Sequence, residues 1–333
     1  MEIRPFEFDY KELIDLIDAS WPREHNGYID YTEPFLRHII ESPDTDNDLT
    51  LCIYKNNKLV SFLYSKKTNI YINGIKYKAL LNSLASTRPD EMHWFPYIKL
   101  KDYCIKKAIK MGYQLNFGFA AMGIQNNNIE QLYAQKNKFY YVVANSFGAL
   151  NAIPGDIIRN TFNRDNDIKI CALNESLIEN CLQLINQFIL KKCTIYQEWK
   201  NNSFLYYFSK LNFSEGKVIL KKNKIVGFVG YSKFIMKFKT VRRKICVIYH
   251  FFMDNLDDFE KETVLHLIAN HIQKDGFDGI SIPNTGYFSF DLLYKKIGLK
   301  RLPFQIYKTN LLMSMFTEKH YLKPKEKFYL EIL

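Results

Sequence analysis

The side chains best suited to proton transfer in this sequence stand just after a long apolar segment. Residues 78–85 are mostly apolar, which is typical of a buried strand, and Glu91 and His93 follow them. A histidine has an ordinary pKa near ~6.5 and can take up a proton near neutral pH, and a positioned carboxylate can also act as a general base. Glu91 and His93 are therefore candidate bases, and a water chain anchored by Asn82 or Ser83 is the alternative.

The histidines and cysteines do not have the spacing of metal ligands. His266 and His271 are five residues apart and so do not share one face of a helix, and no H-E-x-x-H motif occurs. The six cysteines contain no C-x-x-C pair. We therefore expect no metal site, and we expect reduced, buried thiols of the kind usual in a cytoplasmic protein.

The composition is that of a folded protein with polyanionic partners. Of the 333 residues, 47% are hydrophobic and 24% are charged, values that exclude a disordered or fibrous chain. The formal net charge of +11 favours contact with a nucleotide cofactor, RNA or an acidic surface. No apolar run approaches the ~18 residues that span a bilayer, and the first residues lack the features of a signal peptide. The length is twice the ~150 residues of an ordinary domain, which favours two domains.

The chain contains the same unit twice. Residues 55–62 read KNNKLVSF and residues 221–228 read KKNKIVGF, a shift of 166 residues. Both lie between short apolar runs, which predicts two hairpins. A similar shift of 164 residues relates Gly112 to Gly276, each at the end of a predicted helix. Several landmarks in one order indicate a tandem duplication.

Each unit is predicted to have a mixed, mostly antiparallel sheet that is flanked by helices and ends in a parallel crossover, an α/β (α+β) arrangement. The turn pair Pro154-Gly155 and the polar stretch 163–167 predict the boundary between the units. The elements on which the order rests are the strands 78–85 and 244–251, the helices 97–111 and 259–274, and the strands 114–119 and 279–282. The predicted domains are residues 1–155 and 167–315, followed by a peripheral tail, 316–333.

Two motifs give this arrangement a family resemblance. In the second unit Tyr294 stands four residues before Gly298, and in the first unit Tyr133 stands four before Asn137, which we expect to take the left-handed conformation of that glycine. The span from Pro89 to Gly112 is 24 residues. Over about residues 1–150 and 167–312 the chain resembles the GNAT superfamily of acyl-CoA-dependent N-acyltransferases, duplicated head to tail.

The resemblance implies a reaction and a donor site. The reaction would move an acyl group, with acetyl the expected one, from acetyl-CoA or another acyl-CoA to an amine of a small molecule or peptide. Tyr133 would be the acid that protonates the leaving thiolate, and the donor would lie where two strands separate. The residues that the resemblance places along the donor are Leu84, Ala85, Ser86, Thr87, Gly118 and Asn126.

The loop that would bind the diphosphate of coenzyme A departs from the family pattern. The family has a glycine-rich loop there, whereas residues 90–97 read DEMHWFPY. The first unit could still bind the diphosphate through the helix N-terminus, unless Trp94, Phe95 and Tyr97 fill the space. The second unit has three aspartates in residues 253–259, which would repel a diphosphate and act as helix caps instead. Coenzyme A binding is therefore expected in the first unit only.

Two other functions stay open at this stage. The missing glycines and the positive charge also fit a resemblance to the Fem family of aminoacyl transferases, which are duplicated units that take an aminoacyl group from tRNA. A catalytically silent binding module with the same fold is the third possibility. The C-terminal unit would shape the acceptor site or a homodimer interface. The aromatic residues that could line an acceptor pocket are Trp21, Tyr28, Tyr31 and Phe35.

Overall fold

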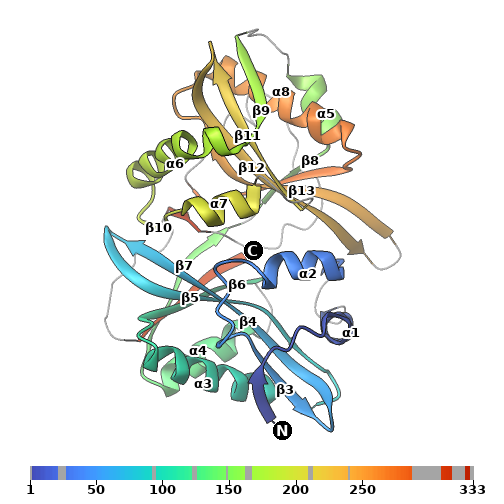
Figure 1. Cartoon of the computed structure of the whole chain (residues 1–333), viewed down its shortest axis with the longest axis vertical. Helices are drawn as coiled ribbons and strands as arrows, with labels where there is room; N and C mark the ends of the chain where they lie inside the picture. Colours follow the sequence, from blue (N-terminus) through green and yellow to red (C-terminus); the bar gives the residue numbers. More distant parts are fainter. Residues whose placement is uncertain are drawn as a thin grey trace. The chain divides into compact units, whose positions relative to one another are not determined.

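The computed structural model of the chain (Figure 1) describes residues 2–21, 28–91, 95–121, 126–147, 149–161, 167–208, 213–238, 241–286, 309–316 and 327–330. Its contacts divide the chain into two compact units. Unit 1 comprises Met1–Ser146, Lys308–Glu326 and Ile332–Leu333, and unit 2 comprises Phe147–Tyr307 and Lys327–Glu331.

Unit 1 is built on a sheet with the strand order β1-β3-β4-β5-β6-β15-β7. The pairs β1–β3, β3–β4 and β4–β5 are antiparallel, β6 runs parallel to β5, and β15 runs antiparallel to β6. The strands are β1 (Glu2–Pro5), β3 (Leu51–Lys55), β4 (Lys58–Ile72), β5 (Ile75–Thr87), β6 (Leu115–Ala121), β7 (Tyr140–Phe147) and β15 (Thr309–Met315), and the short β2 (Tyr28–Ile29) lies outside this order.

Helices cover both faces of this sheet. Neighbouring residues of a strand point to opposite faces, and on β4 the Tyr64 hydroxyl donates to the Ile39 carbonyl of α2 whereas Ser65 contacts Cys104 of α3. Helices α2 and α3 therefore lie on opposite faces. The helices of unit 1 are α1 (Tyr10–Ser20), α2 (Glu33–Ile40), α3 (Phe95–Lys110) and α4 (Asn126–Lys136).

Unit 2 repeats this topology. Its sheet has the order β9-β11-β12-β13-β14-β8, with β14 parallel to β13 and the other neighbours antiparallel. The strands β9, β11, β12, β13 and β14 thus correspond in order and direction to β1, β3, β4, β5 and β6, which confirms the predicted duplication. The strands are β8 (Ala149–Ala152), β9 (Ile168–Ala172), β11 (Ser214–Lys221), β12 (Lys224–Phe238), β13 (Val241–Phe252) and β14 (Gly279–Pro283), with the short β10 (Ile195–Gln197) and β16 (Phe328–Tyr329) paired to each other.

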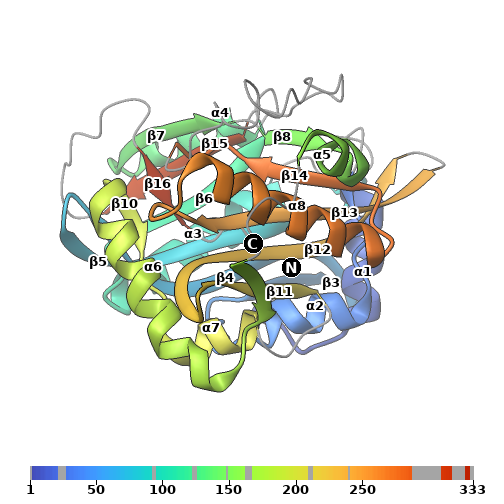
Figure 2. The same ribbon diagram turned by 90° about the horizontal axis from the view of Figure 1, so that it is seen from above.

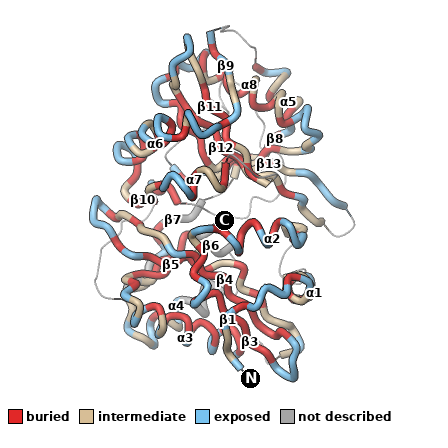
Figure 3. The backbone as a smooth tube through the Cα atoms, viewed as in Figure 1, coloured by how far each residue is buried: buried red, intermediate tan, exposed pale blue. Residues whose placement is uncertain are grey.

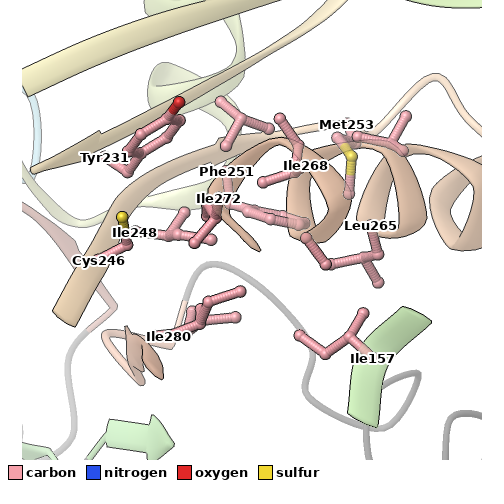
Figure 4. Packing of buried hydrophobic residues seen from close by; sticks show 14 of the residues in the cluster. Ile157, Tyr231, Cys246, Ile248, Phe251, Met253, Leu265, Ile268, Ile272 and Ile280 are labelled. Atoms are coloured by element: carbon pink, nitrogen blue, oxygen red, sulfur yellow. The ribbon is translucent and has the colours of Figure 1, made fainter. Parts of the chain in front are cut away.

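The core of unit 2 lies between this sheet and α8. Figure 2 shows α8 lying along the strands β12 to β14, and Figure 4 shows Ile268 and Ile272 of α8 beside Ile248 and Ile280 of the sheet. In both units the buried residues follow the strands, and the exposed ones lie on outer helix faces and hairpin ends (Figure 3). The helices of unit 2 are α5 (Pro154–Asn160), α6 (Ile178–Lys192), α7 (Asn201–Phe208) and α8 (Asp258–Lys274), with a 3₁₀ turn at Glu175–Leu177.

Local signals in the sequence explain the turns and caps. Asn56 and Asn57 both have positive φ, of 51° and 59°, and Lys222 and Asn223 do the same in unit 2, so both hairpins have the tight turn that matches strand twist. Asp257 accepts a hydrogen bond from the Glu260 amide and forms a capping box at the start of α8. The predicted hairpins and the predicted cap are confirmed.

Several segments depart from the predicted division of the chain. β8 pairs with β14 and so belongs to unit 2, although it precedes the predicted boundary. β15 pairs with β6 along its whole length and so belongs to unit 1, although it falls within the predicted second domain. The predicted peripheral tail contains Phe328, Tyr329 and Leu330, which are buried in unit 2. Strand pairing between segments far apart in the sequence overrides the local boundary signal.

The cysteines and the lengths of the helices also bear on the sequence predictions. All six cysteines are free, and five of them are buried, as expected for reduced thiols. Within the described part of the chain, no helix is long and apolar enough to cross a bilayer.

Candidate functional site

The candidate site is a fork between two parallel strands of unit 1. β5 and β6 pair from Ala79↔Leu115 to Leu81↔Phe117, and no pair follows, although β5 continues to Thr87 and β6 to Ala121. The two strands therefore separate from Asn82 and Gly118 onward. This is where the sequence predicts the opening.

The β5 arm of the fork contains a bulge. Phe62 pairs with Ser86 and Tyr64 with Ser83, so Leu84 and Ala85 lie opposite the single residue Leu63. Leu84 has φ 53°, a left-handed conformation that costs a non-glycine residue about 1–2 kcal/mol. A bulge leaves its extra residue out of the ladder, so backbone N–H groups here are candidates for binding a ligand.

A chain of buried polar side chains connects the strands at the point where they separate. The Asn82 amide donates to Ser65 Oγ at 2.8 Å and accepts from Asn116 Nδ2 at 2.6 Å, and Asn116 Nδ2 also donates to the Leu80 carbonyl at 3.0 Å. Lys101 of α3 donates to Asn116 Oδ1 at 3.3 Å. All four side chains are buried. They hold β4, β5, β6 and α3 together where backbone pairing ends, so the fork has a fixed shape.

Glycine at position 118 keeps the base of the fork free of side chain. A Cβ atom there would lie 3.0 Å from the Asn82 carbonyl oxygen. In unit 2 the last parallel pair is Val247↔Ser281, so the residue equivalent to Gly118 is Ile282. Ile282 is buried in the core of unit 2. The same place in the repeat therefore has no side chain in unit 1 and a buried isoleucine in unit 2.

Tyr133 lies on α4 and contacts α3. Its hydroxyl donates to Asp102 Oδ1 at 3.2 Å, and Lys106 pairs with the same carboxylate. The left-handed residue that ends α4 is Lys138, with φ 59°, so the expectation that Asn137 takes this conformation is wrong. Asn137 instead donates through its side chain to the Tyr133 carbonyl, and the Phe139 amide donates to the Ala134 carbonyl. The Phe139 bond, together with the bond from the Lys138 amide to the Gln135 carbonyl, forms a Schellman motif around Lys138.

The predicted bases are not brought to the fork by any described contact. Glu91 forms an ion pair with Lys55 at 3.0 Å, at the β3–β4 hairpin. His93 lies outside the described residues, as does Tyr294, and the side chain of Asn126 at the start of α4 is outside the described part as well. Of the bulky residues near the start of α3, Phe95 is 58% exposed and Tyr97 packs in the core, while Trp94 is not described.

The aromatic residues after α1 lie next to the bulge. Trp21 caps the C-terminus of α1, and its indole N–H donates to Ser86 Oγ at 2.9 Å. Its ring meets Tyr31 edge to face at 5.5 Å, and Tyr31 contacts Phe35 at 5.7 Å. Burial raises the pKa of Tyr31, which therefore stays neutral. No pattern in the sequence indicates that Trp21 contacts the bulge, because the two are 65 residues apart.

Unit 2 has an equivalent bulge, but an aromatic cluster surrounds it. Gly230 pairs with His250 and Tyr231 with Ile248, so Tyr249 is the extra residue. His250 is fully buried, and burial lowers its pKa to about 3, so the ring is neutral. The Trp199 indole N–H donates to the Tyr329 hydroxyl, which lies 2.6 Å from His250 Nδ1. Because the indole can only donate, the Tyr329 oxygen accepts from Trp199, and the same hydroxyl hydrogen-bonds His250 Nδ1.

One group of side chains in unit 2 has the types of a metal site. Glu215, His271 and Asp275 have ligand atoms within 4.8 Å of one another. Lys233 pairs with both carboxylates, at 2.9 Å each, and Lys217 pairs with Glu215. Lysine ammonium groups thus neutralise these carboxylates, and the group is an ion cluster that ties strands β11 and β12 to α8.

Comparisons with known proteins agree with the predicted fold. No protein-family model and no curated protein matches the chain. Among solved structures, N-myristoyltransferase of Saccharomyces cerevisiae with bound myristoyl-CoA is similar over 94% of this chain and 82% of that chain, with a TM-score of 0.72 at 11% identity. A GCN5-related N-acetyltransferase from Anabaena variabilis is similar over 94% of this chain and 72% of that chain, with a TM-score of 0.57 at 14% identity. The chain therefore has the fold of the GNAT superfamily, and the predicted fold class is confirmed.

Proposed function

We propose that this protein is an acyl-CoA-dependent N-acyltransferase whose donor site is the fork of unit 1. The observation that carries the proposal is the end of β5–β6 pairing at Leu81 and Phe117, beside a bulge and a glycine. A pantetheine arm is a thin chain with amide groups, and separated parallel strands offer it both space and free backbone groups. The TM-score is higher with the myristoyl-CoA-bound enzyme, at 0.72, than with the N-acetyltransferase, at 0.57. This difference favours a long acyl chain over acetyl as the group that is transferred.

The fork and Tyr133 of α4 would supply two parts of the chemistry. When an amine attacks a thioester, negative charge develops on the carbonyl oxygen, and N–H groups at the bulge, at Leu84 and Ala85, would bind it. The thiolate of coenzyme A leaves with its electron pair and needs a proton. Tyr133 would donate that proton, turning from Asp102 to the sulfur in the complex. Gly118 would let the arm pass close to the backbone.

Donor binding tests the proposal directly. We expect myristoyl-CoA to raise the melting temperature of the whole chain, because a ligand at 100 times its Kd stabilises the folded state by about 2.7 kcal/mol. Acetyl-CoA and free coenzyme A should raise it less than myristoyl-CoA does. If no acyl-CoA stabilises the protein, the proposal is wrong. Retention of tRNA with a steep salt dependence would then favour aminoacyl transfer, and no binding of either would favour a silent module.

Tyr133→Phe separates proton donation from binding. We expect the variant to bind myristoyl-CoA with unchanged affinity and to release coenzyme A roughly 10- to 100-fold more slowly, because only the proton to the thiolate is lost. Release of the thiol can be followed while peptides and small amines are offered as acceptors. Asp102→Asn is the matched control, since it keeps a hydrogen-bond acceptor for the Tyr133 hydroxyl. Equal rates in Tyr133→Phe and the unsubstituted protein would remove Tyr133 from the mechanism.

A further inference from the structure

We propose that Trp21 and Ser86 are positioning residues that aim the Ala85 N–H at the thioester carbonyl, so that the segment after α1 controls the donor site. This inference rests on the proposed function and deepens it. It comes from three observations in unit 1. Leu84 in the bulge has a left-handed conformation, the Ser86 hydroxyl donates to the Leu84 carbonyl, and the Trp21 indole donates to the Ser86 hydroxyl.

A hydrogen bond within the bulge sets the direction of the Ala85 N–H. The Ser86 hydroxyl donates to the Leu84 carbonyl at 3.1 Å. That carbonyl and the Ala85 N–H belong to one planar trans peptide, so they point in opposite directions. Fixing the Leu84 carbonyl from one side therefore fixes the direction of the Ala85 N–H on the other side.

The conformation of Leu84 in the bulge needs support from its surroundings. Leu84 is not a glycine, and its left-handed conformation persists only if its surroundings hold it. Leu84 and Ser86 are both buried, at 7% and 3% exposure, so the hydroxyl that binds the carbonyl has no competing solvent. The Ser86 carbonyl is itself bound by the Ser61 hydroxyl at 3.1 Å.

The Ser86 hydroxyl is in turn hydrogen-bonded to the C-terminus of α1. Trp21 Nε1 donates to Ser86 Oγ at 2.9 Å, which leaves the Ser86 proton directed to the Leu84 carbonyl. One residue earlier, the Ser20 hydroxyl donates to the Thr87 carbonyl at 2.8 Å. The C-terminus of α1 is thus attached to the end of β5 at Ser86 and at Thr87.

The consequence is a coupling between the two substrates. The Trp21 ring packs edge to face on Tyr31, which contacts Phe35, and these residues belong to the segment that we expect to cover the acceptor. A movement of this segment would shift the indole and so loosen the Ser86 hydroxyl. The Ala85 N–H would then bind the carbonyl oxygen best when the acceptor segment is in place.

The infrared stretch of a labelled carbonyl measures this directly and needs no acceptor. With [1-¹³C]myristoyl-CoA bound to the whole chain, we expect a carbonyl frequency below that of the free thioester, because the Ala85 N–H polarises it. In Ser86→Ala and Trp21→Phe this downshift should fall by at least half. The Kd should stay within about threefold, which is less than 1 kcal/mol. Ser86→Thr keeps the hydroxyl and should restore the downshift, and Ser20→Ala, which leaves the Leu84 carbonyl untouched, is the matched control.

The outcomes separate this inference from the proposed function. If myristoyl-CoA binds and the carbonyl frequency is the same in Ser86→Ala, Trp21→Phe and the unsubstituted protein, the positioning role is wrong while the donor site stands. If Ser86→Ala fails to fold, Trp21→Phe alone decides, because it keeps an aromatic ring at this position and removes the indole N–H. If myristoyl-CoA does not bind the unsubstituted chain, both the proposed function and this inference fail.

Discussion

Gly118→Ile abolishes the stabilisation by myristoyl-CoA while the protein still folds: this is the largest effect on binding that we expect. Gly118 stands at the base of the fork, where a Cβ atom would lie 3.0 Å from the Asn82 carbonyl oxygen. A branched side chain would occupy the path of the pantetheine arm, and we expect affinity to fall at least ~100-fold, or about 2.7 kcal/mol. Unit 2 already contains isoleucine at the equivalent position, Ile282, so the fold accommodates this residue.

A graded series makes the test specific. Gly118→Ala adds one methyl group at a contact that must relax by a few tenths of an ångström, so it should weaken binding less than Gly118→Ile. Circular dichroism and the melting temperature without ligand report whether each variant is folded. Gly155→Ala, whose Cβ would lie 3.4 Å from Gln273 Nε2 in unit 2, is the control for a glycine outside the fork. A full ligand-induced shift in Gly118→Ile would place the donor elsewhere.

The parts of the fold that could be predicted from the sequence depend on local chemistry. Two asparagines in a row favour the left-handed turn of a hairpin, and the Asp257–Glu260 pair favours a capping box. The hairpin signal repeats with the duplicated unit, so the two halves could be aligned before any strand was placed. The positions of β8 and β15 could not be predicted, because which sheet edge a strand joins depends on contacts between segments far apart in the sequence.

Of the candidate site, too, only a part could be predicted from the sequence. The separation of the strands near Leu84 and Gly118 followed from a family resemblance, which fixes the topology. The side chains that shape the fork, Asn116 and Lys101 among them, gave no signal, because an isolated asparagine or lysine in a sequence is usually solvated. Trp21 was predicted as an acceptor contact, and its hydrogen bond to Ser86, 65 residues away, is visible only in the folded chain.

The second large effect that we expect is on stability, at the aromatic cluster of unit 2. Tyr329→Phe removes one oxygen atom that accepts from the Trp199 indole and also hydrogen-bonds His250 Nδ1. The phenyl ring still fills the space, so the cost is that of two buried nitrogens left without a partner, about 1–3 kcal/mol each. We expect urea unfolding to show a loss of roughly 2–5 kcal/mol and the melting temperature to fall by roughly 10 °C.

A double-mutant cycle shows whether this loss arises from the hydrogen bonds. His250→Leu removes one of the two partners. In that background Tyr329→Phe should lower the free energy of unfolding by at least about 1 kcal/mol less than it does in the unsubstituted protein. Rings of Phe208 and Trp199 lie 4.8 Å and 5.5 Å from the His250 ring, and they keep the site apolar enough to receive leucine. Additive effects would mean that the hydroxyl and the imidazole are not coupled. Since the predicted peripheral tail contains Tyr329, a large loss would also show that the end of the chain is part of the core of unit 2.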